Sequence, residues 1–124
     1  MNLLLDTHYV LALISPEPPT HEPWATDPLF ISVASFWEIA IKVRQGKLSA
    51  SVPPQKLEEA VLSWGCTVLP VEAGHAVAEV EPWPATKDPF DRLLLAVCSV
   101  EGLRLVTRDR LLIDHPLAWR PASA

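Results

Sequence analysis

The stretch DPFDRLLLAVCSVEGLRLV, residues 88–106, contains the start of a helix, a helix interior and a strand. Asp88 is a favoured N-cap residue, and Pro89 suits the first helical position, where the backbone N–H that proline lacks would have no partner. Residues 93–100 are mostly apolar around the whole helix, which predicts a central, buried helix. Residues 104–106 then read as a short strand, so the stretch predicts a helix that leads directly into a sheet.

Outward from this stretch, short apolar runs alternate with helical patterns along the chain. The predicted strands are residues 3–5, 29–32, 66–69 and 104–106, with a further edge strand at 117–119. The predicted helices are residues 7–14, 35–46, 53–64, 72–80 and 88–100, with a short one at 108–113. This alternation predicts an α/β fold in three layers, with a parallel sheet of four to five strands flanked by helices.

Residues 15–28 interrupt the alternation because they hold five prolines. A regular helix cannot run through them, so we predict a loop or a few short turns, and a candidate mobile flap. We find no internal repeat and no composition shift, and we therefore expect residues 1–124 to form one domain.

Four acidic residues lie at or shortly after the ends of hydrophobic segments, namely Asp6, Glu38, Asp91 and Asp109. The carboxyl ends of parallel strands share one edge of a sheet, and binding sites form at that edge. Four carboxylates gathered there would repel one another unless a cation joined them. A hard divalent ion that prefers oxygen ligands, such as Mg²⁺ or Mn²⁺, is the expected guest.

Each acid also has a purely structural explanation. Asp6 can cap the first helix, and Asp91 gains from the dipole of the helix that begins at residue 89. Glu38 can sit on a solvated helix face paired with Lys42, four residues on. Asp109 can be a turn or cap residue. Because all four acids fall at the same predicted edge, a shared metal site is favoured over a chance grouping.

Composition narrows the classes of partner. The formal net charge is −5, which argues against binding nucleic acid through bulk positive charge. It leaves a metal-dependent nuclease open, because bound cations reverse the sign of the local charge.

Cys66 and Cys98 are not at a spacing typical of a metal site or a CxxC pair, and we expect buried, reduced thiols. No apolar run approaches a membrane span and no signal peptide is apparent, so we expect a cytoplasmic protein.

Four motifs in order resemble those of PIN-domain proteins, and in particular of VapC-type toxins from toxin–antitoxin pairs. They are Leu4-Leu5-Asp6-Thr7-His8, Ser35-Phe36-Trp37-Glu38-Ile39, Asp88-Pro89-Phe90-Asp91-Arg92 and Leu105-Val106-Thr107-Arg108-Asp109. The resemblance implies a Mg²⁺- or Mn²⁺-dependent endoribonuclease with Asp6, Glu38, Asp91 and Asp109 as its acids. It also implies a small antitoxin protein and a homodimer. Between His8 and Leu29 the chain is shorter and richer in proline than the two-helix segment usual in this family.

Within that site we expect Asp6 and Asp91 to bind the metal directly. Glu38 and Asp109 would bind it directly, bind it through water, or position the nucleophile. Thr7 and Thr107 are expected to orient these acids by hydrogen bonds. Arg92 and Arg108 are the candidates for contacts with RNA phosphates. The four histidines and five tryptophans show no ligand spacing and no basic interleaving, so we read them as surface, packing or dimer residues.

Other functions stay open at this stage. A PIN-fold nuclease of RNA processing would need no antitoxin, and an inactive PIN-like module would only bind RNA or a peptide. A haloacid-dehalogenase-like phosphatase would want a second Asp two residues after Asp6, where His8 stands. A receiver-like domain would want paired acids after the first strand, and only Asp6 is present.

Overall fold

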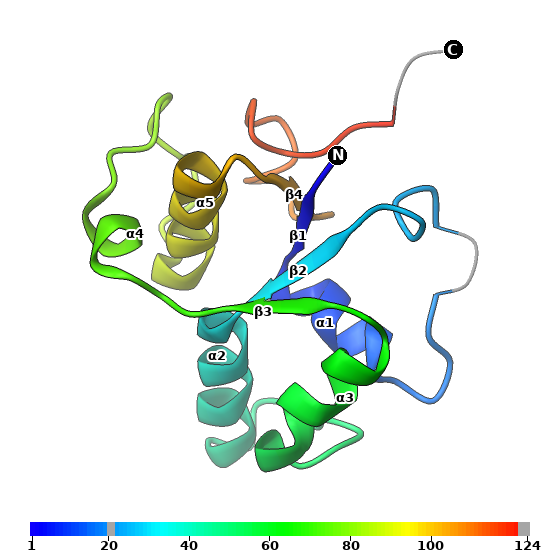
Figure 1. The fold of residues 1–124 in the computed structure, drawn as a ribbon. Helices are drawn as coiled ribbons and strands as arrows, with labels where there is room; N and C mark the ends of the chain where they lie inside the picture. The colour runs from blue at the N-terminus through cyan, green and yellow to red at the C-terminus, as the bar shows by residue number, and fades with distance from the viewer. Residues whose placement is uncertain (20–21, 122–124) are drawn as a thin grey trace.

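The computed structural model describes residues 1–19 and 22–121. Its centre is a four-stranded sheet in the order β3-β2-β1-β4, with all neighbouring strands parallel (Figure 1). The strands are β1 (Leu3–Leu5), β2 (Leu29–Ser32), β3 (Thr67–Leu69) and β4 (Arg104–Val106). The predicted α/β fold with a parallel sheet is therefore confirmed, and the carboxyl ends of all four strands face one edge.

Alternation along β1 divides the core into two halves. Leu3 and Leu5 are fully buried in a cluster that includes side chains of α1 (Thr7–Leu13) and α3 (Leu57–Ser63). Leu4 is fully buried in a second cluster dominated by α5 (Pro89–Glu101). Successive side chains of a strand point to opposite faces, so the sheet is covered by helices on both sides as a three-layer arrangement requires.

Helix α2 (Val33–Arg44) begins directly after β2. It starts two residues earlier than we predicted because Ser32 is its N-cap, with the Ser32 Oγ accepting a hydrogen bond of 3.0 Å from the Ala34 amide. The helix contacts both α1 and α5, and thus bridges the two helical layers. This position brings the middle of α2 to the carboxyl edge of the sheet.

Helix α5 is confirmed in detail. Asp88 caps it, accepting a hydrogen bond of 2.8 Å from the Phe90 amide, and Pro89 is its first residue. Gly102, with a φ of 71°, ends it in the left-handed conformation that favours glycine. The predicted helix at 53–64 is a short 3₁₀ turn, η1 (Pro54–Lys56), continued by α3. Helix α4 (Ala73–Val77) is shorter than the predicted 72–80 because the chain is already extended at Ala78, with a ψ of 135°.

The C-terminal part differs from prediction. The helix expected at 108–113 is a series of turns, in which the Asp109 side chain accepts a hydrogen bond of 2.8 Å from the Leu111 amide and the Asp109 carbonyl accepts from the Leu112 and Ile113 amides. The edge strand expected at 117–119 is reduced to one parallel bridge between Leu105 and Ala118. The described part of the proline-rich stretch is irregular, as predicted, and Thr20 and His21 lie outside the described residues.

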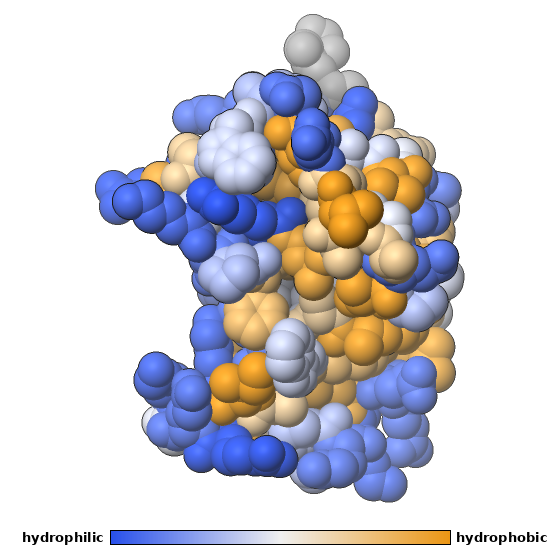
Figure 2. Space-filling view, turned by 90° about the vertical axis from the view of Figure 1, so that its left-hand side faces the viewer, coloured by the Kyte–Doolittle hydropathy of each residue, from blue (hydrophilic) through white to orange (hydrophobic). Residues whose placement is uncertain are grey.

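Several large apolar side chains remain exposed. Figure 2 shows hydrophobic residues gathered in a band over the face that lies on the left of Figure 1, where α2, α4 and α5 are found. Trp37 on α2 is 62% exposed and Val77 on α4 is 77% exposed. Within the described residues, no helix is long and apolar enough to cross a membrane.

Candidate active site

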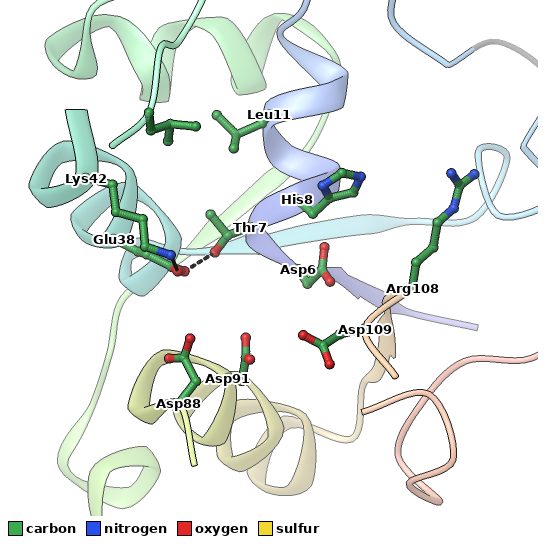
Figure 3. A pocket seen from close by; sticks show the side chains of 11 residues that line it. Asp6, Thr7, His8, Leu11, Glu38, Lys42, Asp88, Asp91, Arg108 and Asp109 are labelled. Atoms are coloured by element: carbon green, nitrogen blue, oxygen red, sulfur yellow. Dashed lines mark hydrogen bonds and ion pairs between the residues drawn. The ribbon is translucent and has the colours of Figure 1, made fainter. Parts of the chain in front are cut away.

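A cavity of about 460 Å³ opens at the carboxyl edge of the sheet. Side chains from the residue after β1, from α1, α2 and the start of α5, and from the segment after β4 line it (Figure 3). Its lining residues are Asp6, Thr7, His8, Leu11, Glu38, Lys42, Leu48, Asp88, Asp91, Arg108 and Asp109. All four acids singled out in the sequence therefore line one cavity, although they come from four separate segments of the chain.

Asp6 follows β1 directly and is 5% exposed. Its Oδ1 caps α1 by accepting a hydrogen bond of 3.0 Å from the Tyr9 amide, so the capping role considered above is real. Burial raises the pKa of Asp6, and a hydrogen bond with the Thr107 side chain opposes the rise. The capping bond uses Oδ1, and the Asp6 side chain still lines the cavity.

Glu38 lies one and a half turns into α2 and is 4% exposed, so it is not on a solvated face. Its Oε1 accepts a hydrogen bond of 2.6 Å from the Thr7 hydroxyl, and its Oε2 pairs with the Lys42 ammonium. The hydrogen bond to Glu38 raises the pKa of Lys42. The predicted pairing of Glu38 with Lys42 is confirmed, and Thr7 contacts an acid of the site as expected.

Asp91 is the third residue of α5 and points into the cavity beside Asp88 (Figure 3). Its pKa is raised to about 7, first by burial and then by the negative charges of Asp88, Asp109, Glu38 and Asp6. The Thr86 hydroxyl, 3.5 Å from Asp91 Oδ2, is at the limit of a hydrogen bond. Burial and the neighbouring carboxylates thus both favour the protonated form of Asp91.

Asp109 lies in the turn after β4 and is exposed. Its amide donates a hydrogen bond of 3.1 Å to the Thr107 Oγ1, while its Oδ1 accepts from the Leu111 amide. Thr107 therefore contacts the backbone of one acid and, through its bond with Asp6, the side chain of another. These contacts fix the direction in which the turn presents Asp109.

Asp88 is a cavity residue that we had assigned only to helix capping. It caps α5 and also lines the cavity, and its charge is the second largest contribution to the raised pKa of Asp91. The signal in the sequence was the pair of acids three residues apart at one helix start, where one acid suffices for capping. Asp88 thus makes a fifth carboxylate of this cavity.

The two arginines proposed to contact RNA occupy different surroundings. Arg108 lines the cavity, lies 3.1 Å from Glu22 Oε1 and stands over the Tyr9 ring at 5.4 Å. Arg92 is not among the lining residues. Its guanidinium lies 4.9 Å from the Trp83 ring centroid, and its Nε donates a hydrogen bond of 2.8 Å to the Thr86 carbonyl. Arg92 is thus engaged in holding the segment before α5.

The histidines and cysteines separate into buried and exposed residues. His75 and His115 are buried and hydrogen-bonded at both ring nitrogens, as packing residues are. His8 is exposed at the cavity, and His21 lies outside the described residues. Cys66 and Cys98 are free and buried, as predicted.

Of the tryptophans, Trp24 is buried in the core, while Trp37, Trp64 and Trp83 are at least 49% exposed.

The donor chemistry of the cavity fits a hard divalent cation, because the converging side chains offer carboxylate oxygens. In residues 1–19 and 22–121, no three His, Cys, Asp or Glu side chains stand close enough to form a preassembled ligand group. Mutual repulsion among the carboxylates explains this spacing, as does the engagement of Glu38 with Thr7 and Lys42. Asp6, Asp91 and Asp109, with Glu38, are the residues that would hold a cation.

Comparison with known proteins gives the family. The chain matches the PIN domain over residues 3–116. It is 37% identical over 93 residues, 72% of this chain and 68% of the relative, to Ribonuclease VapC22 of Mycobacterium tuberculosis (strain ATCC 25618 / H37Rv). The fold is similar to a chain of a toxin-antitoxin complex from Klebsiella pneumoniae, with a TM-score of 0.63 at 18% identity, covering 98% of this chain and 99% of the other. The chain therefore belongs to the PIN-domain family.

Proposed function

We propose that this protein is a Mg²⁺- or Mn²⁺-dependent endoribonuclease of the VapC type, which hydrolyses phosphodiester bonds of RNA at its acidic cavity. Membership of the PIN family supports the proposal, as does the relative that is a VapC ribonuclease. The toxin–antitoxin complex with a similar fold agrees with a toxin role.

One observation carries the proposal: five carboxylates line a single cavity, where burial first and then their negative charges raise the pKa of Asp91 to about 7. Lys42 and Arg108 are the lysine and arginine of the lining, and each already pairs with a glutamate. Crowded carboxylates cost stability, since burial and like charges both disfavour ionisation. A cation site explains why these side chains face one another.

The residues have separate tasks in the proposed reaction. When bound, a divalent cation supplies positive charge that acidifies water and stabilises negative charge on phosphate. Asp6, directly after β1, and Asp91, in the first turn of α5, would hold that cation. Thr7 and Lys42 fix the carboxylate of Glu38, which with Asp109 orients the attacking water. Arg108, at the cavity rim, binds a phosphate of the strand.

Cleavage of a mixed structured RNA tests the proposal. Purified protein is incubated with Mn²⁺ or with EDTA, next to an Asp91→Asn variant purified identically. We expect EDTA to abolish cleavage and Asp91→Asn to reduce it by about a thousandfold. A Glu101→Gln variant, which loses a charge outside the cavity, should cleave like the wild type. Cleavage that persists in Asp91→Asn means contamination, and no cleavage with any metal contradicts the proposal.

The partners follow from the same family resemblance and stay predictions. We expect a small antitoxin protein and a homodimer, and the exposed hydrophobic band over α2 and α4 agrees with an assembly surface. We also expect residues 1–124 to act as one nuclease domain in the cytoplasm. The nearest alternative is an RNA-processing nuclease without an antitoxin. A small protein encoded beside this chain that blocks cleavage would favour the toxin.

A further inference from the structure

A second cavity, of about 410 Å³, adjoins the acidic one. Arg108 lines both cavities, and the segment from Val106 to Asp109 passes between them, with Thr107 in the second and Asp109 in the first. The second cavity is lined by Tyr9, Glu22, Pro23, Trp24, Val106, Thr107, Arg108, Ile113, Asp114, Trp119, Arg120 and Pro121. Apart from Thr107 and Arg108, these residues have no part in the proposed reaction.

The lining of the second cavity combines aromatic and guanidinium groups. Tyr9 and Trp24 are buried and meet edge to face with centroids 5.2 Å apart, while Trp119 is half-buried. Arg108 and Arg120 are exposed; the Arg108 guanidinium lies 5.4 Å from the Tyr9 ring centroid, and the Arg120 guanidinium donates a hydrogen bond of 3.0 Å to the Ile113 carbonyl. Aromatic rings and arginine planes are the surfaces on which unpaired bases of single-stranded RNA stack. The volume falls within the range of small-ligand sites.

The acids of the second cavity suit a base better than a bare phosphate. Glu22 and Asp114 both line it, and their carboxylates can accept hydrogen bonds from the N–H groups at the edge of a base. Two arginines and two acids leave the lining without a net formal charge. The cavity as a whole therefore has the chemistry of a base site, with cationic groups available for the attached phosphate.

Arg108 is placed to bind the phosphate between the two cavities. It is now paired with Glu22 at 3.1 Å, with the two side chains 66% and 26% exposed. An ion pair this open to solvent is weak, so a phosphate can replace Glu22 as the partner of Arg108. Because Arg108 lines both cavities, a phosphate bound to it would lie beside the acids and beside the aromatic lining at once.

We propose that the second cavity binds a nucleobase of the RNA strand next to the bond cleaved in the acidic cavity, and that Arg108 holds the phosphate joining the two positions. This inference rests on the proposed nuclease function and adds to it a position that selects among RNA sequences. The base would lie against Trp119 and Ile113, whose side chain is 42% exposed at the cavity.

The inference is tested by measuring RNA binding to a variant whose second cavity is obstructed by a substitution. The probe is a mixed-sequence, fluorescein-labelled single-stranded hexaribonucleotide, and its anisotropy is followed in the Asp91→Asn background with millimolar Mg²⁺ so that the RNA stays intact. Ile113→Glu adds bulk and a negative charge to the lining. Val100→Glu is the matched control, because Val100 is a similar aliphatic residue, 49% exposed, and lines neither cavity.

We expect Ile113→Glu to weaken binding about tenfold, as loss of a stacked base does, and Val100→Glu to leave it unchanged. In the cleaving protein, Ile113→Glu should raise KM with kcat within about twofold, because the base contact is made equally in the bound and the reacting strand. Arg108→Gln should reduce the slope of log K against log salt by about 0.7, the value for one lost phosphate contact on a single strand.

The outcomes separate this inference from the nuclease proposal. Equal binding by Ile113→Glu and Val100→Glu, with cleavage by the wild type, overturns the base site and leaves the nuclease standing. Binding that depends on Ile113 in a protein that cleaves nothing supports the base site and overturns the nuclease. Failure of the hexaribonucleotide to bind any form of the protein overturns the base site.

Discussion

The acidic cavity and the junction between α4 and α5 both contain buried ionisable groups, but the junction pairs a histidine with a glutamate, whereas the cavity gathers carboxylates. At the junction, the buried His75 lies 2.8 Å from Glu101 and accepts a hydrogen bond of 2.9 Å from the Glu72 amide. In the cavity, five carboxylates share one lysine and one arginine among the lining residues. The junction is built for stability, whereas the cavity keeps an excess of negative charge.

This contrast explains how two acids of the same helix play opposite parts. Asp91 near the start of α5 has its pKa raised by burial and by four other carboxylates. Glu101 at the end of α5 is 38% exposed and faces a histidine across the junction. Removing charge from the cavity should therefore stabilise the fold and end function. Removing a partner at the junction should destabilise the fold and leave function intact.

The largest effect on stability is expected at the junction. His75→Ala empties a buried site and leaves the Glu72 amide without its acceptor, which should lower the free energy of unfolding by about 2–3 kcal/mol in urea. Cleavage per folded molecule should stay unchanged. Val77→Ala, in the same helix but 77% exposed, is the control and should cost less than about 0.5 kcal/mol. If His75→Ala also lowered the free energy of unfolding by less than about 0.5 kcal/mol, the junction would not be the stabilising region that we contrast with the cavity.

A smaller effect of opposite sign is expected in the cavity. The pKa of Asp91 is raised from its ordinary value of 3.8 to about 7 in the folded protein. Between pH 3.8 and pH 7 the folded protein therefore keeps a proton on Asp91 that the unfolded chain has released. Wild-type stability should thus fall as pH rises from 4 to 7 and level off above. Asp91→Asn lacks this dependence and should be more stable at pH 8 by about 1–2 kcal/mol, after allowance for solvent screening.

A matched control separates the cavity from the start of a helix in general. Glu58 also lies in the first turn of a helix, α3, and is exposed. Glu58→Gln should lose a few tenths of a kcal/mol through the helix dipole, with little change from pH 5 to 8. Urea unfolding at several pH values measures both variants. An Asp91→Asn protein that is less stable than the wild type at pH 8 would refute the crowding of charge.

An effect no larger than that of Asp91→Asn is expected from added metal. If the cavity binds Mg²⁺ with a Kd of about 1 mM, then about 10 mM Mg²⁺ adds about 1.4 kcal/mol to the free energy of unfolding. For a domain of this size the melting temperature should rise by about 5 °C. The rise should vanish in Asp91→Asn and persist in Glu101→Gln. Equal shifts in both variants would place the metal elsewhere.

Local signals in the sequence predicted the frame of the molecule well. Short apolar runs located the four strands, and Asp88-Pro89 located the start of α5. Because parallel strands share a carboxyl edge, the grouping of four acids in one cavity also followed from the sequence. These features depend on residues close together in the chain or on a general rule of parallel sheets.

The individual partners of residues far apart in the chain were not predictable, although Thr7 was expected to contact one of the acids. The hydrogen bond from Thr7 to Glu38 joins residues 31 apart, and the pair of Arg108 with Glu22 joins residues 86 apart. The second cavity has walls from three separate parts of the chain for the same reason. The helix expected at 108–113 is also absent: Asp109 begins a turn there, with its side chain accepting from the Leu111 amide and its carbonyl from the Leu112 and Ile113 amides.

Calorimetric titration with Mn²⁺ tests most directly whether the acids of the cavity form one cation site. At pH 6.5 an Asp91 with a pKa raised to about 7 still carries a proton in much of the protein, so Mn²⁺ binding should release protons, and the release should fall as the pH rises. Repeating the titration in buffers of different ionisation enthalpy measures this release. We expect it in the wild type and in Glu101→Gln, with binding lost in Asp91→Asn. Binding without proton release, or equal binding by Asp91→Asn, would contradict a cation site built on Asp91.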